Sequence, residues 1–194
     1  NWEEKNILRV KKPLELFATD HNIAVNELKG VLERGKTNLL DQRNKRVRPL
    51  LDDKIILGWN ALMNTACSKA FAATGNEEYR KLAIGNMEFL LKNFVTANPH
   101  EFYHTWKNGL SKFPAFLDDY AFLIEALIRL HEITANTDWL LKAKAIAEMV
   151  TENFSEPETG FFFYTRSDQE DVIVRKKEVY DGAVPSGNAV MATV

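Results

Sequence analysis

Two stretches of sequence decide the fold, and they match when one is shifted by 60 positions. Residues 71–94 read FAATGNEEYRKLAIGNMEFLLKNF, and residues 131–154 read HEITANTDWLLKAKAIAEMVTENF. The shift places Thr74 on Thr134 and Asn76 on Asn136, and it aligns the Asn-Phe pair that ends each stretch. Self-similarity at a fixed period indicates a repeated supersecondary unit. We therefore expect one structural unit to occur at least twice.

The apolar spacing predicts that each unit is a helical hairpin. Apolar residues recur at helical spacing over residues 54–73 and 119–133, with few polar exceptions. The helices predicted next, over residues 77–94 and 138–153, have a narrower apolar stripe and charge on the opposite face. This order fits an inner ring of buried helices and an outer ring of amphipathic ones. The sequence therefore predicts an all-α fold that is part of an (α/α)6 toroid of helical hairpins.

Short segments with strand character follow each outer helix. Residues 101–113 surround the turn Lys107-Asn108-Gly109, and residues 160–174 surround Ser167-Asp168-Gln169. We expect both segments to be β-hairpin insertions at one end of the toroid. An open solenoid would show the same period, but it would not need long strand-bearing insertions on one side only.

The chain before the repeat is also predicted to be helical. Residues 25–44 form an amphipathic pattern, preceded by a short helix after Pro13. We assign residues 1–48 to the leading helices of the toroid and residues 49–194 to its helical hairpins. The chain begins without methionine, and its last apolar run stops with neither a C-cap nor a polar tail. We therefore expect both ends to continue into a longer protein.

Composition limits the classes of partner. A length of 194 residues with 45% hydrophobic residues is enough to bury a core. A net charge of -2 gives no field that would attract nucleic acid or an anionic membrane, and no run approaches the roughly 20 apolar residues of a membrane span. The single cysteine, Cys67, cannot form an internal disulfide. We expect a cytoplasmic protein without nucleic-acid or membrane partners.

Polar motifs stand where each inner helix is predicted to begin. They are RPLLDDK at residues 48–54 with GWN at 58–60, FLDDYAF at residues 116–122, and DGAVPSGN at residues 181–188. The repeat makes Asn60 and Tyr120 equivalent, and Asn188 is the natural third member because alanine follows all three. We therefore expect three helix starts to converge on one cleft.

In this order, these motifs resemble the helical barrel of a thioredoxin-domain-linked family that includes the spermatogenesis-associated thioredoxin-like proteins. The resemblance covers residues 48–188. It implies an N-terminal thioredoxin-like domain in the full-length protein, which residues 1–194 do not include. It also implies a six-hairpin toroid similar to those of N-acylglucosamine 2-epimerases and unsaturated glucuronyl hydrolases. On this basis the expected ligand is a small molecule or an oligosaccharide, and no cofactor is expected.

The chemistry of glycoside cleavage makes the aspartates of these motifs candidate catalytic residues. Cleavage needs one acid and a second carboxylate as base or nucleophile. Adjacent residues on a helix face different ways, so Asp118 and Asp119 are not expected to form that pair with each other. Helix capping is the competing interpretation, above all for Asp118. The candidate catalytic residues are Asp53, Asp119, Asp181 and Tyr120.

A sugar cleft also requires an aromatic platform surrounded by amide and hydroxyl groups. Trp59 could supply the platform, although a core position on the helix is an equal alternative. Arg48 could pair with a carboxylate of the cleft or of the substrate. The candidate substrate-binding residues are Arg48, Trp59, Asn60, Asp118, Ser186 and Asn188.

Three functions stay open at this point. The epimerases that the resemblance suggests rely on histidines, and one precedes Ala-Phe in their inner-helix pattern where this chain has Tyr120. Tyrosine has a reference pKa near 10, which would have to fall substantially for base catalysis. Hydrolysis by paired aspartates is therefore slightly preferred to epimerisation. The third possibility is a non-catalytic glycan- or protein-binding module attached to a thioredoxin-like domain.

A metal site is suggested by one segment and rejected on its context. Residues 100–104 read HEFYH, which formally matches the H-E-x-x-H zinc motif of helical proteases. The segment is aromatic and approaches an Asn-Gly turn, so we expect it to be extended. Positions four apart in a strand are about 13 Å apart and cannot share one ion. We predict no metal site.

Overall fold

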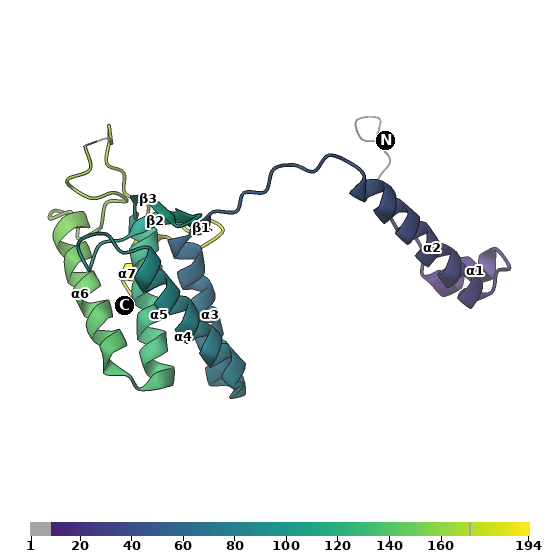
Figure 1. The fold of residues 1–194 in the computed structure, drawn as a ribbon, viewed down its shortest axis with the longest axis horizontal. Coiled ribbons are helices and arrows are strands. Elements are labelled where there is room, and N and C mark those ends of the chain that lie inside the picture. The colour runs from purple at the N-terminus through teal and green to yellow at the C-terminus, as the bar shows by residue number, and fades with distance from the viewer. Residues whose placement is uncertain (1–8, 171) are drawn as a thin grey trace. The chain divides into compact units, whose positions relative to one another are not determined.

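The computed structural model describes residues 9–170 and 172–194, and it consists of two compact units (Figure 1). The first unit, Asn1–Leu51, contains helices α1 (Leu14–Asp20) and α2 (Val25–Asn44), so the predicted helix over residues 25–44 is confirmed. The second unit, Asp52–Val194, contains the two repeats and the candidate motifs apart from Arg48. The assignment of the leading helices to the same toroid stays a prediction.

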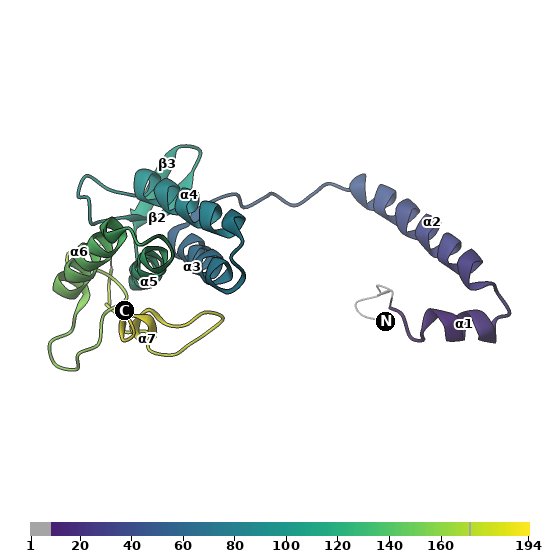
Figure 2. The ribbon, with the colours of Figure 1, turned by 90° about the horizontal axis from the view of Figure 1, so that it is seen from below.

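The second unit is mainly helical. Its elements are β1 (Ile55–Ile56), α3 (Leu57–Thr74), α4 (Glu77–Asn93), β2 (Tyr103–Lys107), β3 (Leu110–Pro114), α5 (Leu117–Thr134), α6 (Thr137–Phe154) and α7 (Gly187–Met191). Helix α5 packs against α3, α6 and α7, and α4 covers α3 (Figure 2). This order places α3, α5 and α7 on the inner side and α4 and α6 on the outer side, as the sequence predicts.

Helix α5 is the centre of the hydrophobic core. Ten of its residues are buried, which confirms that its nearly continuous apolar surface is covered on most sides. Tyr120, Leu123 and Leu127 are among the largest fully buried side chains. Within the described ranges, no helix is both long enough and apolar enough to cross a membrane.

The two helical hairpins share their turn chemistry, residue for residue. Asn76 and Asn136 cap the outer helices, since each side-chain oxygen accepts an amide hydrogen two residues on at 3.0 Å. The preceding residues, Gly75 and Ala135, both adopt left-handed backbone conformations, with φ values of 68° and 54°. The 60-residue period is therefore visible in hydrogen bonds as well as in sequence.

A small antiparallel sheet, in the order β1-β2-β3, lies at the N-terminal ends of α3 and α5 (Figure 1). Asn108 and Gly109 connect β2 and β3 with φ values of 51° and 80°, which suit the tight turn of a β-hairpin. This confirms the first predicted insertion. Strand β1 corrects the predicted start of the second helix: Ile55 and Ile56 are β-branched and pair with Trp106 and Thr105, so α3 begins only at Leu57.

The second predicted hairpin is wrong. Among the described residues of 160–174, only Phe162 takes part in a β-bridge, to Ser155. The reason lies in the partners of the loop backbone. The Arg175 guanidinium donates to the Thr165 carbonyl at 2.8 Å, and the Tyr164 amide donates to the Lys176 carbonyl. Both Arg175 and Lys176 lie beyond the predicted hairpin, residues 160–174. These bonds replace the ladder that a hairpin would need.

Candidate functional site

Two adjacent aspartates at the start of α5 connect the starts of the neighbouring inner helices. Asp119 Oδ1 accepts the Gly58 amide hydrogen of α3 at 2.8 Å, and Asp118 Oδ1 accepts the Gly187 amide hydrogen of α7 at 2.7 Å. The first amides of a helix lack intrahelical partners and lie at the positive end of its dipole, so both carboxylates are well placed. The prediction that the two side chains point apart is confirmed.

Both contacts depend on glycine. A Cβ atom built on Gly187 would lie 2.5 Å from Asp118 Oδ1, and one built on Gly58 would lie 2.9 Å from Asp119 Oδ1. A side chain at either position would push the carboxylate away from the helix start. The glycines of the GWN and SGN segments are therefore required by the close approach of the aspartates.

Asp119 also holds a histidine. Its Oδ2 atom accepts the Phe116 amide hydrogen at 3.0 Å and lies 2.7 Å from His104 Nδ1 of β2. Since a carboxylate only accepts hydrogen bonds, Nδ1 must carry the proton of this contact. The neutral imidazole is then left with Nε2 as an acceptor. Asp119 is 3% exposed, whereas the His104 side chain is 26% exposed, so the imidazole is the accessible member of the pair.

Aromatic rings surround this pair. The His104 ring meets Phe116 edge to face, with centroids 4.9 Å apart, and Phe116 stacks on Tyr164 at the same distance. Burial raises the pKa of Tyr164 above its ordinary value, and the charges of Asp118 and Asp119 raise it further. Tyr164 is therefore a neutral phenol beside the two aspartates.

Asp118 differs from Asp119 in its surroundings. Burial raises the pKa of the Asp118 carboxyl above 3.8, the Gly187 hydrogen bond opposes this rise, and the charges of Asp119 and Glu178 add to it. The site therefore favours the protonated acid at Asp118 more than water does. A carboxylic acid of this kind can donate a proton.

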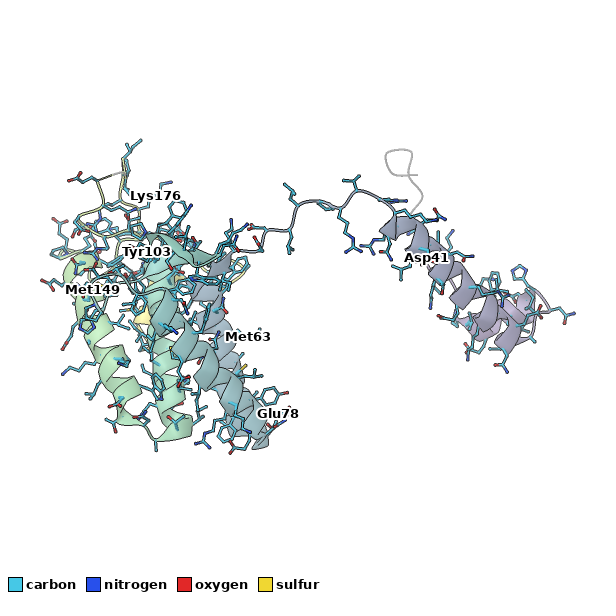
Figure 3. All side chains as sticks on the ribbon, in the orientation of Figure 1. Asp41, Met63, Glu78, Tyr103, Met149 and Lys176 are labelled. Atoms are coloured by element: carbon cyan, nitrogen blue, oxygen red, sulfur yellow. The ribbon has the colours of Figure 1, made fainter. Side chains whose placement is uncertain are left out.

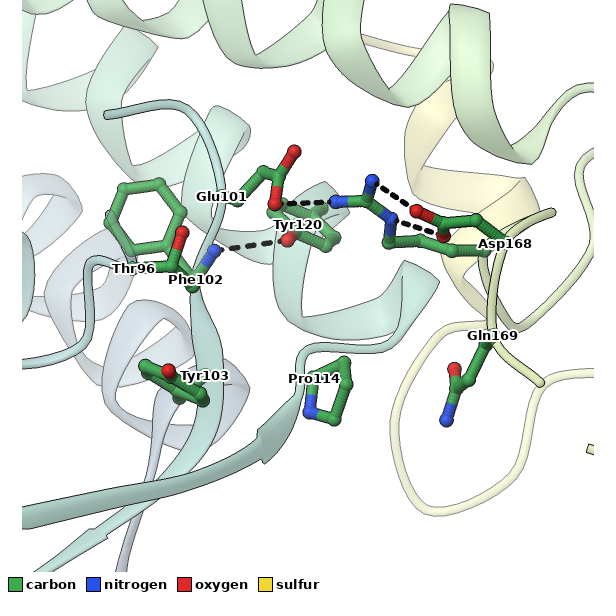
Figure 4. Close-up of a pocket in the computed structure, with 9 residues that line it drawn as sticks. Thr96, Glu101, Phe102, Tyr103, Pro114, Tyr120, Asp168 and Gln169 are labelled. Atoms are coloured by element: carbon green, nitrogen blue, oxygen red, sulfur yellow. Dashed lines mark hydrogen bonds and ion pairs between the residues drawn. The ribbon is translucent and has the colours of Figure 1, made fainter. Parts of the chain in front are cut away.

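Tyr120 is buried in the core, and its hydroxyl bonds to the loop backbone. Its hydroxyl oxygen accepts the Phe102 amide hydrogen at 3.0 Å, and burial raises the pKa of Tyr120 to about 12. Figure 4 shows this bond at the edge of a pocket of about 240 Å³. Arg166 also lines this pocket and pairs with Glu101 and Asp168. The contacts of Tyr120 connect α5 to the loop that follows α4.

Asn188 makes the equivalent contact in the next repeat. Its side-chain oxygen accepts the Phe162 amide hydrogen at 2.8 Å, and Phe162 is the repeat partner of Phe102. The nearby Ser186 hydroxyl caps α7 by accepting the Ala189 amide hydrogen at 3.2 Å. Asp181 in turn accepts the Ser186 amide hydrogen at 2.9 Å. This motif therefore shapes the loop that leads into α7.

The candidates on α3 and before it are spread over different surroundings. Asn60 donates to the Ile56 carbonyl at 2.9 Å. Asp53 is exposed and pairs with Lys107, whose hydrogen bond lowers the pKa of the Asp53 carboxyl. Trp59 is 67% exposed and lies one helical turn before Met63, which is labelled on α3 in Figure 3. Among the described residues, none of the hydrogen bonds or ion pairs of these three side chains is with His104 or Asp119.

Arg48 belongs to the first unit, where its guanidinium donates to Asn44 at 3.1 Å. Its assignment to the cleft stays a prediction. The sequence pattern did not indicate His104 as a partner of Asp119, because its H-E-x-x-H spacing suggested a zinc ligand instead. The extended conformation expected for residues 100–104 is confirmed at His104, which lies in β2. In the described ranges, no three histidine, cysteine, aspartate or glutamate residues are grouped to hold a metal ion.

The chain matches part of the fold of carbohydrate-active α/α toroids. The cellobiose 2-epimerase of Spirochaeta thermophila superimposes with a TM-score of 0.52 and 19% identity, over 57% of this chain and 28% of that chain. A family 105 glycoside hydrolase of Clostridium acetobutylicum superimposes with a TM-score of 0.56 and 12% identity, over 92% of this chain and 52% of that chain. The unsaturated glucuronyl hydrolase of a Bacillus species superimposes with a TM-score of 0.55 and 19% identity, over 76% of this chain and 41% of that chain. These likenesses confirm the predicted fold class.

Several proteins of known sequence are similar to this chain over nearly its whole length. An uncharacterized protein of Caenorhabditis elegans is 33% identical over 97% of this chain and 26% of its own length. Spermatogenesis-associated protein 20 of Mus musculus is 29% identical over 97% of this chain and 25% of its own length. The chain is thus a distant homologue of the spermatogenesis-associated protein 20 family and spans about a quarter of these relatives. No protein-family model matches the chain.

Proposed function

We propose that the start of α5 is an acid–base site that acts on a carbohydrate, with His104 as the group that transfers the proton. The observation that carries this proposal is the 2.7 Å contact between His104 Nδ1 and the buried Asp119 carboxylate. The likeness to toroids that process sugars supports the class of ligand. A cytoplasmic location and an attached thioredoxin-like domain stay predictions.

Asp119 has the role of a positioning residue in this proposal. Its two oxygens already accept hydrogens from Gly58, Phe116 and His104, which leaves it little capacity to act on a substrate. A carboxylate on Nδ1 fixes the tautomer and the orientation of an imidazole, and it stabilises the imidazolium that forms when Nε2 takes up a proton. This role differs from the catalytic acid or base that the sequence predicted at Asp119.

Asp118 is the second group that the site offers. A proton removed from one face of a carbon next to a carbonyl must be returned by a second group to invert that carbon. The raised pKa of the Asp118 carboxyl suits a proton donor. Epimerisation relies on histidines, and this chain has Tyr120 where one was expected. Because His104 offers a histidine at the site instead, we favour epimerisation or isomerisation of a sugar over hydrolysis.

The test follows the proton directly. The full-length protein is incubated in heavy water with a panel of reducing mono- and disaccharides, and deuterium at C2 is followed by NMR. We expect labelling of at least one sugar, and a loss of about 100-fold or more in His104→Asn, because general acid–base groups contribute roughly that much. His100→Asn is the matched control, since His100 is an exposed turn residue four positions earlier.

Each other outcome is informative. No labelling of any sugar, or equal losses in the two histidine variants, would contradict the proposal. The release of new reducing ends without labelling, abolished in Asp118→Asn, would transfer the assignment to hydrolysis. A shift in the melting temperature without any turnover would indicate a binding module.

A further inference from the structure

Phe113 in β3 has a backbone conformation that its side chain disfavours. Its φ angle is 62°, its side chain is 63% exposed, and a proline follows it. Bulky side chains rarely adopt a positive φ, and a residue before proline is further restricted to extended conformations. Since Phe113 is exposed, burial of its ring does not offset this strain. Backbone strain of this kind is concentrated at functional sites.

The unusual φ changes the direction of the ring. The register of β2 and β3 places Phe113 opposite His104, because Thr105 pairs with Lys112 and Tyr103 with Pro114. In a regular strand Phe113 would share a face of the hairpin with His104. The ring instead lines a pocket together with Thr105 and Lys112, which belong to the other face. The strained conformation thus brings an aromatic ring into this pocket.

The pocket is cationic as well as aromatic. It has a volume of about 340 Å³, and the residues Lys54, Lys107 and Lys112 line it with Phe113 and Leu110. Lys54 pairs with Asp52 at 3.1 Å, and Lys107 pairs with Asp53. Lys112 pairs with no carboxylate in the part of the chain that the structure describes. Three lysines against two aspartates leave one positive charge for a ligand.

We propose that this pocket binds a sugar ring that carries a carboxylate. The C–H face of the ring packs on Phe113, and the carboxylate pairs with Lys112, which combines an apolar platform with a charge-assisted contact. That the ligand is a sugar rests on the proposed function. Because the pocket and the His104 imidazole lie on opposite faces of the hairpin, the acidic sugar is a recognition unit and not the reacting one.

The test is the affinity of the full-length protein for glucuronate, with glucose as the neutral control, measured by calorimetry. We expect glucuronate to bind more tightly than glucose, and we expect Phe113→Gly and Lys112→Gln each to weaken glucuronate binding about tenfold or more. Phe113→Gly should at the same time raise the melting temperature by about 3 °C, because glycine adopts a positive φ without strain.

Ala135→Gly is the matched control, since Ala135 also has a positive φ, of 54°, but lies at the C-terminal end of α5 and is not among the residues that line the pocket. It should raise the melting temperature and leave glucuronate affinity unchanged. Equal affinities for glucuronate and glucose, or an unchanged affinity in Phe113→Gly, would overturn the proposal. Binding without C2 labelling contradicts only the acid–base function, and labelling without preference for glucuronate contradicts only this inference.

Discussion

Replacing Asp119 by asparagine is expected to destabilise the chain by about 3 kcal/mol, whereas the same replacement at Asp118 is expected to cost less than about 1 kcal/mol at neutral pH. Both oxygens of Asp119 accept hydrogen bonds in the core. An asparagine has only one acceptor oxygen, so its NH2 group would meet an amide or imidazole hydrogen. A buried donor without a partner costs about 1–3 kcal/mol, and the charge-assisted bond to His104 is lost as well.

Asp118 behaves differently because, among the described residues, the one hydrogen bond of its carboxylate is the one that Oδ1 accepts from Gly187. Asparagine keeps that acceptor and removes a charge that burial disfavours. The pKa of the Asp118 carboxyl is raised in the folded state, so its protonated form contributes stability below the ordinary value of 3.8, and this contribution is lost as the pH rises through the raised value. The free energy of unfolding of Asp118→Asn should therefore increase relative to that of the wild type as the pH rises.

Urea unfolding of the three proteins between about pH 3 and pH 8 gives the comparison, with free energies from linear extrapolation. Similar losses for Asp118→Asn and Asp119→Asn would contradict the different roles that the structure gives the two carboxylates. A difference between wild type and Asp118→Asn that does not change with pH would contradict the raised pKa.

Replacing Gly187 by alanine is expected to destabilise the chain by about 2–3 kcal/mol. The new Cβ would lie 2.5 Å from Asp118 Oδ1, 2.9 Å from Leu117 Cγ and 3.1 Å from the Asp118 amide nitrogen, so both side chain and backbone of α5 must shift. Gly85 in the exposed part of α4 is the matched control, since nothing lies within 4 Å of its Cβ position. Gly85→Ala should stabilise the chain by about 0.5–1 kcal/mol.

The cause of the Gly187→Ala loss can be isolated with a double-mutant cycle. Asp118→Ala removes the oxygen that the new Cβ would meet, so the double variant should lose less stability than the sum of the two single variants. Strict additivity in urea unfolding would show that the clash with Asp118 is not the cause. An unchanged stability of Gly187→Ala would contradict the close approach of α5 and α7 itself.

The sequence predicted the fold because its signals are local and repeated. The turn residues Asn76 and Asn136 recur with the same cap, and the apolar spacing of each helix is visible within that helix. The second hairpin could not be predicted, since Arg175 lies beyond the segment and takes the Thr165 carbonyl that a strand would have used. That contact is decided by tertiary structure and not by local propensity.

The candidate site was only partly predictable for the same reason. The motifs at the helix starts were found, but their partners lie on other elements: Asp118 caps α7 instead of its own helix, and Asp119 meets His104 fifteen residues earlier. Of the three residues predicted to be equivalent, Tyr120 and Asn188 both accept a backbone amide hydrogen of the preceding loop, whereas the Asn60 amide group donates to the Ile56 carbonyl. A sequence pattern places such residues at one end of the fold, but it does not say which of them face one another.

The protonation of the His104 ring tests the central claim most directly. Long-range proton–nitrogen NMR spectra of the protein labelled with ¹⁵N in its histidines distinguish the two tautomers at about pH 8, and His104→Asn assigns the signals. The structure predicts a proton on Nδ1, protected from exchange by the bond to Asp119, and an Nε2 atom without a proton. A His104 ring with its proton on Nε2, or with Nδ1 exchanging as fast as the exposed His100, would contradict the proposed acid–base site.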